Sequence, residues 1–421
     1  MVRADVTAAP GREDWTVRAL VRWRVTPWWA RVLIVYAVTR VITALLLAAF
    51  AIVQAQANNT AVPDLFTFGA NWDGQWYWLI AWQGYPSELP LTADGHVAPN
   101  AWAFMPVFPY VAGALGVIGV PFPIAGVLVS VVAGAVAMLL FFRLMRESGL
   151  DPEQSLFAVV LLCVAPLSPM FQVAYAESLG LALLFWALLL FVQRRYWLVI
   201  PVVVLASFTR PTGLAFAAFL FFYFVARIVR RLREPDTYPF PPREFTAIVV
   251  AGLTSFAAGF AWAGIAWLVT DSMTAYTDTE LAWRAGYVGY GELVPFAGWV
   301  QGLEFWLRFV GVPGAAALPL AVASLVLTAL VFAGFLLLPW TRRLALAVRL
   351  WLVGYALYLV LVFFPQSSTW RLLLPLAPAL GAFAVPRSRA LRVALVIAGI
   401  GLQVLWIDAC WWRAPDDWSP P

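Results

Sequence analysis

The sequence predicts an all-α, polytopic membrane protein with about eleven transmembrane helices. Hydrophobic residues make up 63% of the 421 residues, charged residues make up only 12%, and the mean hydropathy is +0.83. A soluble domain carries about 25% charged residues, so this composition excludes a soluble protein. The apolar residues also form long runs separated by short arginine-bearing segments, as expected of a chain that crosses a bilayer repeatedly.

The charged residues are distributed as topology signals and not as a nucleic-acid-binding surface. The sequence pI is near 9.4, but the arginines fall in short clusters between hydrophobic spans, which the positive-inside rule places in the cytoplasm. A single histidine, His96, excludes a histidine-rich metal site, and Cys163 and Cys410 have no metal-ligand spacing. We therefore expect no nucleic-acid partner, no metal and no cofactor.

The chain divides into a short cytoplasmic segment, a membrane domain and a short tail. Residues 1–29 are polar and arginine-bearing, so they predict a cytoplasmic segment without a cleavable signal. The transmembrane domain is predicted over residues 30–408 and an extracytoplasmic tail over residues 409–421. Two long extracytoplasmic loops, residues 54–121 and 271–313, interrupt the membrane domain.

An apolar segment at residues 103–120 decides the topology. If it spans the membrane, the next helix runs outward and Arg143 and Arg146 lie outside. If it lies in the outer interface, both arginines are cytoplasmic, and most later arginine clusters follow them. We adopt the second arrangement, in which the N-terminus is inside and the C-terminus is outside. The predicted spans are residues 30–53, 122–142, 156–174, 179–192, 196–208, 213–226, 245–270, 315–338, 350–364, 372–385 and 391–407.

Three outer turns carry polar side chains at an unusual depth. The predicted spans beside residues 209–211 rise only about 20 Å, against a hydrocarbon core of about 30 Å. Non-helical backbone at that depth persists where it lines protein or a watery cavity, so the turns predict a cavity floor. They carry Glu177 in YAES, Arg210 in TRPTG, and Gln366 and Arg371 in FPQSSTWR. One such arginine alone is also explained by snorkelling or by an ion pair, but three turns on one side favour a site.

The first outer loop contains an aromatic stretch at residues 71–86, NWDGQWYWLIAWQGYP. Its one carboxylate, Asp73, stands among Trp72, Trp76 and Tyr77. Such rings favour the headgroup layer, so one interpretation is an interfacial anchor with an incidental aspartate. The other is a carboxylate held at the membrane face for chemistry on a lipid-borne substrate, and the three polar turns favour it.

Four sequence blocks, in this order, resemble the PIG-V mannosyltransferases of the GT-C superfamily of membrane glycosyltransferases. The blocks are WDGQWYWLIAWQGYP (72–86), FMPVFPY (104–110), YAES with TRPTG (175–178 and 209–213) and FPQSSTWRLLLP (364–375). The resemblance extends from the first span to about Pro378, and the first block is the most specific.

The resemblance implies a GT-C-like fold that transfers mannose from a polyprenyl-phosphate-linked donor on the non-cytoplasmic side. The catalytic carboxylate of the superfamily lies in the first outer loop, and the matching position here is Asp73. Juxtamembrane helices of the superfamily in that loop agree with a segment 103–120 that does not span. Eukaryotic members act on glycosylphosphatidylinositol precursors, whereas this sequence looks like that of a bacterial plasma-membrane protein. The acceptor therefore stays open between a lipid, a lipoglycan and a protein hydroxyl.

The residues fit an inverting transfer with one general base. Asp73 is the predicted catalytic base, and Arg371 and Arg210 are the predicted ligands of the donor phosphate. The aromatic rings either stack on a sugar or anchor the loop. The residues predicted to contact substrate are Trp72, Gln75, Trp76, Tyr77, Glu177 and Gln366.

Three other classes of protein are compatible with parts of the sequence. A lipid-linked sugar flippase or transporter also presents arginines to a phosphate, but it needs a polar route through both leaflets. An acyltransferase needs a histidine base, and His96 has no partner motif. An acidic pair, Asp278 and Glu280, is typical of a solvated loop and is a weak metal candidate. A non-enzymatic scaffold does not explain polar residues at depth.

Overall fold

The described residues fold almost entirely as helices. The computed structural model describes residues 25–415 together with residues 18, 22 and 23, so most of the predicted cytoplasmic segment 1–29 and the last part of the tail lie outside the described residues. Within the described part, the only extended pairing is an isolated bridge between Leu91 and Val97.

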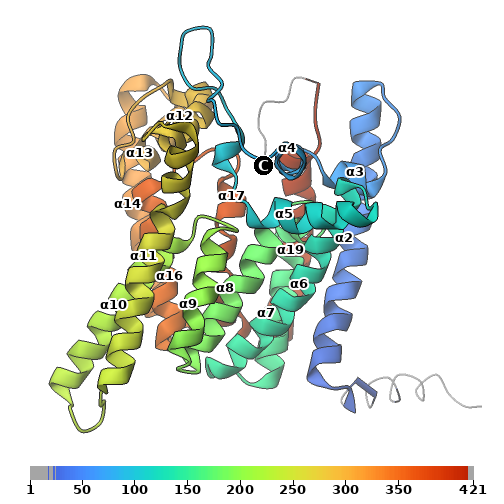
Figure 1. The fold of residues 1–421 in the computed structure, drawn as a ribbon. Helices are drawn as coiled ribbons and strands as arrows, with labels where there is room; N and C mark the ends of the chain where they lie inside the picture. Colours follow the sequence, from blue (N-terminus) through green and yellow to red (C-terminus); the bar gives the residue numbers. More distant parts are fainter. Residues whose placement is uncertain (1–17, 19–21, 24, 416–421) are drawn as a thin grey trace, which may run out of the picture.

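Six of the described helices are long and apolar enough to cross a membrane. They are α2 (Trp28–Asn58), α6 (Phe122–Glu147), α10 (Gly213–Arg233), α11 (Pro242–Thr270), α14 (Gly314–Leu337) and α19 (Arg389–Trp406). Shorter apolar helices lie among them, namely α7 (Pro152–Val164), α8 (Glu177–Val192), α9 (Tyr196–Ser207), α16 (Leu346–Val362), η4 (Leu374–Ala379) and α18 (Leu380–Ala384). Figure 1 shows the long helices running side by side. The predicted all-α, multi-pass membrane protein is confirmed.

Two of the predicted spans are broken by prolines. The prediction of a helix over residues 156–174 was wrong, because α7 ends at Val164 before two prolines and a 3-10 turn, η3 (Ser168–Phe171), follows. The prediction over residues 372–385 was also wrong as a single α-helix. Pro375 and Pro378 lie in the 3-10 helix η4, and only α18 after them is α-helical.

The segment at residues 103–120 lies across the helix ends. It contains α5 (Val107–Ala114) and a 3-10 turn, η2 (Leu115–Ile118), which together are too short to span a bilayer. In Figure 1, α5 and the preceding α4 (Asp73–Gln83) run across the long helices and not along them. The backbone N–H of Val107 donates to the carbonyl of Phe208, which ties α5 to the end of α9. The long first loop therefore contains juxtamembrane helices, as predicted.

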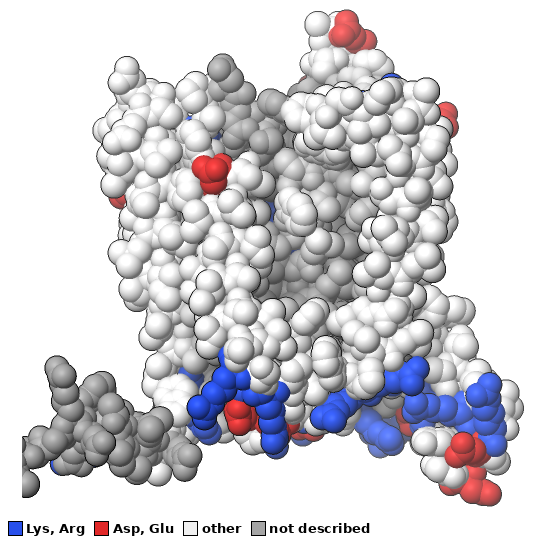
Figure 2. Space-filling view, turned by 180° about the vertical axis from the view of Figure 1, so that it is seen from behind, with Lys and Arg blue, Asp and Glu red and all other residues white. Residues whose placement is uncertain are grey.

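The predicted loop at residues 271–313 is mostly helical. It forms α12 (Ala275–Val288) and α13 (Ala297–Phe309), and Figure 1 shows both at the end of the molecule that carries α4 and the short helix α17 (Thr369–Leu372). A band of arginines lies at the opposite end: Figure 2 shows it along the lower edge, where Figure 1 places the hairpin between α10 and α11.

Small residues bring α6 close to the turn that precedes α8. A Cβ atom at Gly126 would lie 2.7 Å from the Cβ atom of Ala174. Ser130, one helical turn further along α6, donates from its hydroxyl to the carbonyl of Tyr175 at 3.0 Å. In membranes, small residues let helices approach closely, and here they fix the segment that leads into Glu177.

Candidate active site

Four charged side chains from four separate segments form one chain of ion pairs. Arg371 on α17 pairs with Asp73, the first residue of α4, and its Nη1 atom lies 3.7 Å from Oε1 of Glu177, the first residue of α8. The same Oε1 atom lies 3.3 Å from Nη2 of Arg210, in the turn between α9 and α10. The aromatic loop and all three polar turns therefore meet at one place, which we call the ionic cluster (Asp73, Glu177, Arg210 and Arg371).

The backbone around Asp73 is held from two directions. Its N–H donates to the hydroxyl of Tyr175 at 3.0 Å. Its neighbour Trp72 has a φ of 56°, and the Trp72 indole N–H donates to the carbonyl of Trp411 at 2.7 Å. A non-glycine residue with positive φ is strained and persists where its surroundings fix it. The positive φ at Trp72 turns the backbone, so that α4 begins at Asp73 with the Asp73 carboxylate in the ionic cluster.

The carboxylate of Glu177 is buried but lacks hydrogen-bond donors. Its side chain is 3% exposed, and among the described residues neither of its two oxygens has a hydrogen-bond partner. A buried carboxylate without partners is costly, so the charges of Arg210 and Arg371 are what stabilise it. Such an arrangement leaves both carboxylate oxygens with unused hydrogen-bonding capacity.

A cavity of about 700 Å³ adjoins the ionic cluster. Five of the predicted site residues line it: Asp73, Glu177, Arg210, Gln366 and Arg371. Its size falls within the range of about 300–1,000 Å³ typical of small-molecule sites, and it has room for more than one sugar ring.

Four predicted substrate contacts do not line this cavity. Trp72 packs on the described part of the C-terminal tail, where the guanidinium of Arg413 lies 5.0 Å from its ring centroid. Gln75 is exposed on α4. Tyr77 is 1% exposed and packs edge-on against the ring of Phe108.

Trp76 stands behind the cavity wall. Its ring stacks on Phe104 at 5.7 Å and meets the edge of Trp283 at 5.5 Å, and both of these residues line the cavity. Packing within the protein therefore accounts for the rings of Trp72 and Tyr77, while Trp76 supports the residues of the cavity wall.

One face of α12 supplies cavity residues that the sequence interpretation did not assign. Glu280 was considered there only as half of an acidic pair. Apart from Gly286, the α12 residues that line the cavity share one helical face, and they are Tyr276, Thr277, Glu280, Trp283, Arg284 and Tyr287. Their spacing of three and four residues is a helical signal that was available in the sequence of the loop.

Burial and neighbouring charges act in opposite directions on Asp73 and Arg371. Burial raises the pKa of Asp73 above its ordinary value, and the charge and hydrogen bond of Arg371 offset only part of this rise. For Arg371, burial alone lowers the pKa, but the charges of Asp73 and Glu177 outweigh it, so the pKa is raised and the guanidinium stays charged. Chemically, the site combines a carboxylate of increased basicity with permanently charged anion ligands.

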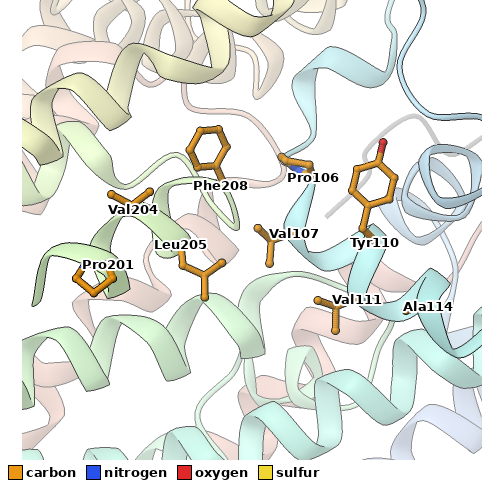
Figure 3. Close-up of a pocket in the computed structure, with 9 residues that line it drawn as sticks. All are labelled: Pro106, Val107, Tyr110, Val111, Ala114, Pro201, Val204, Leu205 and Phe208. Carbon is orange, nitrogen blue, oxygen red and sulfur yellow. The ribbon is translucent and has the colours of Figure 1, made fainter. Parts of the chain in front are cut away.

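A second hollow, of about 810 Å³, contains no charged residue and lies between α5 and α9. Figure 3 shows its wall, which is apolar apart from the hydroxyl of Tyr110. No acid–base chemistry is available there, so the cavity beside the ionic cluster is the candidate active site.

Comparison with known proteins finds a likeness in structure but none in sequence. No family model matches the chain, and no curated protein matches its sequence. Among solved structures, the chain is similar to the archaeal oligosaccharyltransferase AglB from Archaeoglobus fulgidus, solved in complex with an inhibitory peptide and a dolichol-phosphate. The match has 14% identity and a TM-score of 0.40 and covers 89% of this chain and 55% of that one, so this chain spans about half the length of AglB.

Proposed function

We propose that this multi-pass membrane protein is an inverting, GT-C-like glycosyltransferase related to the PIG-V mannosyltransferases. It moves mannose from a polyprenyl-phosphate-linked donor to a hydroxyl of a lipid, lipoglycan or protein acceptor. The observation that carries the proposal is the ionic cluster, in which a candidate base and two candidate phosphate ligands line one cavity.

The reaction uses the cluster as follows. Asp73 takes the proton of the acceptor hydroxyl while the acceptor oxygen attacks C1 of the mannosyl group. The bond between C1 and the phosphate oxygen breaks, and the phosphate leaves with the electron pair. Arg371 and Arg210 stabilise its growing charge, as guanidinium groups do for phosphate oxygens. A single displacement inverts the configuration at C1.

The sequence blocks that resemble PIG-V support this assignment, because each brings a residue to the cavity. The first block supplies Asp73, the second supplies Phe104, and the third supplies Glu177 and Arg210. The fourth supplies Arg371. Blocks that resembled the family only by chance would have no reason to meet at one cavity.

The charge distribution supports a reaction on the extracytoplasmic side. The ionic cluster lies toward the end of the molecule that carries α4 and α12, and the arginine-rich end is opposite. The positive-inside rule assigns the arginine-rich end to the cytoplasm. In the proposed orientation the active site faces outward from a bacterial plasma membrane, where a lipid-linked donor is accessible and nucleotide sugars are absent.

A transfer assay with purified protein in detergent tests the proposal. Polyprenyl-phosphate mannose labelled in the sugar is supplied with a membrane lipid extract as acceptor. We expect transfer that persists in EDTA, since the two arginines neutralise a single phosphate, and no transfer from GDP-mannose. Asp73→Asn should lower the rate about 10²–10⁴-fold.

Two arginine variants complete the assay. Arg371→Lys should weaken donor use substantially, because a point charge does not reproduce a two-pronged guanidinium contact. The matched control is Arg308→Lys, at an exposed position on α13. Wild-type rates for Asp73→Asn, transfer from GDP-mannose or loss of activity in EDTA would each overturn the proposal. Movement of the donor across the bilayer of reconstituted vesicles, without transfer in detergent, would instead indicate a lipid-linked sugar transporter.

A further inference from the structure

The ionic cluster is electrically neutral before any substrate binds. Two arginines and two carboxylates alternate along it, in the order Asp73, Arg371, Glu177 and Arg210. Among the described residues that line the cavity, the remaining cation is Arg284, which donates from Nη2 to the carbonyl of Val362 at 2.8 Å. An incoming phosphate therefore meets arginines whose charges are already balanced, and it competes with a carboxylate for them.

The geometry indicates which carboxylate gives way. Glu177 contacts both arginines and is the more deeply buried, with its side chain 3% exposed against 9% for Asp73. Displacing it breaks two ion pairs. Asp73 stands at the end of the cluster and is paired with Arg371 alone, so displacing Asp73 breaks one.

We propose that Arg371 exchanges partners during each turnover. Asp73 holds Arg371 while the cavity is empty, the donor phosphate displaces Asp73, and Asp73 later displaces the product phosphate. This inference rests on the proposed function for the identity of the phosphate. Glu177 stays in place throughout as the counter-ion that positions both arginines.

The exchange links donor binding to the activation of the base. A carboxylate held by an arginine is a weaker base than the same carboxylate without that partner, because the cation stabilises its ionised form. When the phosphate takes Arg371, Asp73 loses this stabilisation and accepts the acceptor proton more readily. The base is thus masked until the donor is bound, which predicts that donor binds before acceptor.

The exchange also explains release of the product. The donor is a phosphodiester with one negative charge, whereas the leaving polyprenyl phosphate is a monoester with a charge of about −1.5 to −2 at pH 7. The product therefore binds the arginines more tightly than the donor does. After transfer Asp73 carries the acceptor proton, and once it gives that proton to water it regains the charge that competes for Arg371.

A binding measurement distinguishes exchange from a purely structural ion pair. Farnesyl phosphate is titrated into the full-length protein in detergent, with no acceptor present. Asp73→Asn removes the competitor, so we expect it to bind the probe at least tenfold more tightly than wild type. Glu280→Gln is the matched control, because it also removes a carboxylate that lines the cavity without freeing Arg371. Equal gains in the two variants, or weaker binding by Asp73→Asn, would overturn the inference.

A second measurement uses the wild-type protein and so does not depend on the folding of a variant. Carbodiimides modify carboxyl groups, and mass spectrometry of the peptide containing Asp73 gives the rate. If the phosphate frees Asp73 from Arg371, farnesyl phosphate should increase its modification severalfold. An unchanged or slower rate would contradict exchange. Neither measurement requires transfer, so a failed transfer assay counts against the proposed function and leaves exchange to be decided separately.

Discussion

The hydroxyl of Tyr175 accepts a hydrogen bond from the backbone N–H of Asp73, 102 positions away in the sequence, at 3.0 Å. The guanidinium of Arg371 also lies 5.3 Å from the centroid of the same ring. One tyrosine therefore touches both members of the ion pair that the proposed mechanism uses, one through its hydroxyl and the other through its ring.

Tyr175→Phe separates these two contacts, because it keeps the ring and removes the hydroxyl. We expect turnover to fall about 2–13-fold, the equivalent of a hydrogen bond worth about 0.5–1.5 kcal/mol. The KM for donor should change little, since the cation still has its aromatic neighbour. Steady-state kinetics of donor use gives both values. Tyr85→Phe is the control, because it removes a hydroxyl that donates to the carbonyl of Phe104 outside the ionic cluster. A turnover equal to wild type in Tyr175→Phe would show that this contact does not position Asp73.

Gly213→Ala tests whether the close crossing of α10 and α11 positions Arg210. A Cβ atom at Gly213 would lie 2.6 Å from the backbone nitrogen of Gly259, so the helices have to move apart. Overpacking of this kind costs about 1–3 kcal/mol, and we expect a lower thermal midpoint together with weaker donor binding. Gly264→Ala is the control on α11, since nothing lies within 4 Å of its added Cβ atom. Similar midpoints for the two variants would contradict the packing argument.

The pH dependence of the reaction reports on Asp73. The base works only when ionised, and burial raises its pKa above the ordinary value of 3.8. As the pH falls, kcat/KM should therefore decline at a higher pH than it would for an exposed aspartate. Because Arg371 lowers the pKa of Asp73, loss of that partner in the donor complex should move the acid limb of kcat higher still. Coincident limbs for kcat and kcat/KM would count against partner exchange, and a limb below 3.8 would count against Asp73 as the base.

The topology is tested by labelling single cysteines in intact cells with an impermeant thiol reagent, after replacing the buried Cys163 and Cys410. A cysteine at Gly95 should label, because the first loop is outside. Cysteines at Glu147 and Ser388, both exposed in the structure, should not label. Glu147 is preferable to its neighbour Ser148, which is only 4% exposed. Labelling at Glu147 would reverse the assignment of α6 and place the ionic cluster on the cytoplasmic side.

The charged site residues could be predicted from the sequence because they lie between short apolar runs. The roles of the aromatic residues could not be predicted, because they depend on packing. Glu177, Arg210 and Arg371 stood out because a charge between short apolar runs needs a reason. The sequence did not distinguish Trp72 and Tyr77 from residues that stack on a sugar, because the same rings serve for both packing and stacking. Which of the two a ring does depends on partners such as Trp411, which follows 339 residues after Trp72.

Two further differences have local causes that the sequence contains. The prolines after Val164 and around residue 375 end α-helices that hydropathy alone extends, because hydropathy does not register a missing N–H. The face of α12 was missed because polar composition was taken as evidence of a loop. A helix that lines a watery cavity is polar on that face, so the periodicity of its residues is the better signal.

The brevity of α9 has a consequence for the lipid substrates. At 12 residues it rises about 18 Å, so an α9 that starts at the cytoplasmic edge of a hydrocarbon core of about 30 Å ends about 12 Å short of the outer edge, near the turn carrying Arg210. A lipid phosphate that binds this arginine lies deeper in the membrane than the neighbouring headgroups. The hydrocarbon chain attached to that phosphate therefore has to bend. Long, flexible isoprenoids can do this at lower cost than straight acyl chains. For the proposed function, this depth favours donor lipids with flexible tails, independently of any contact with the sugar.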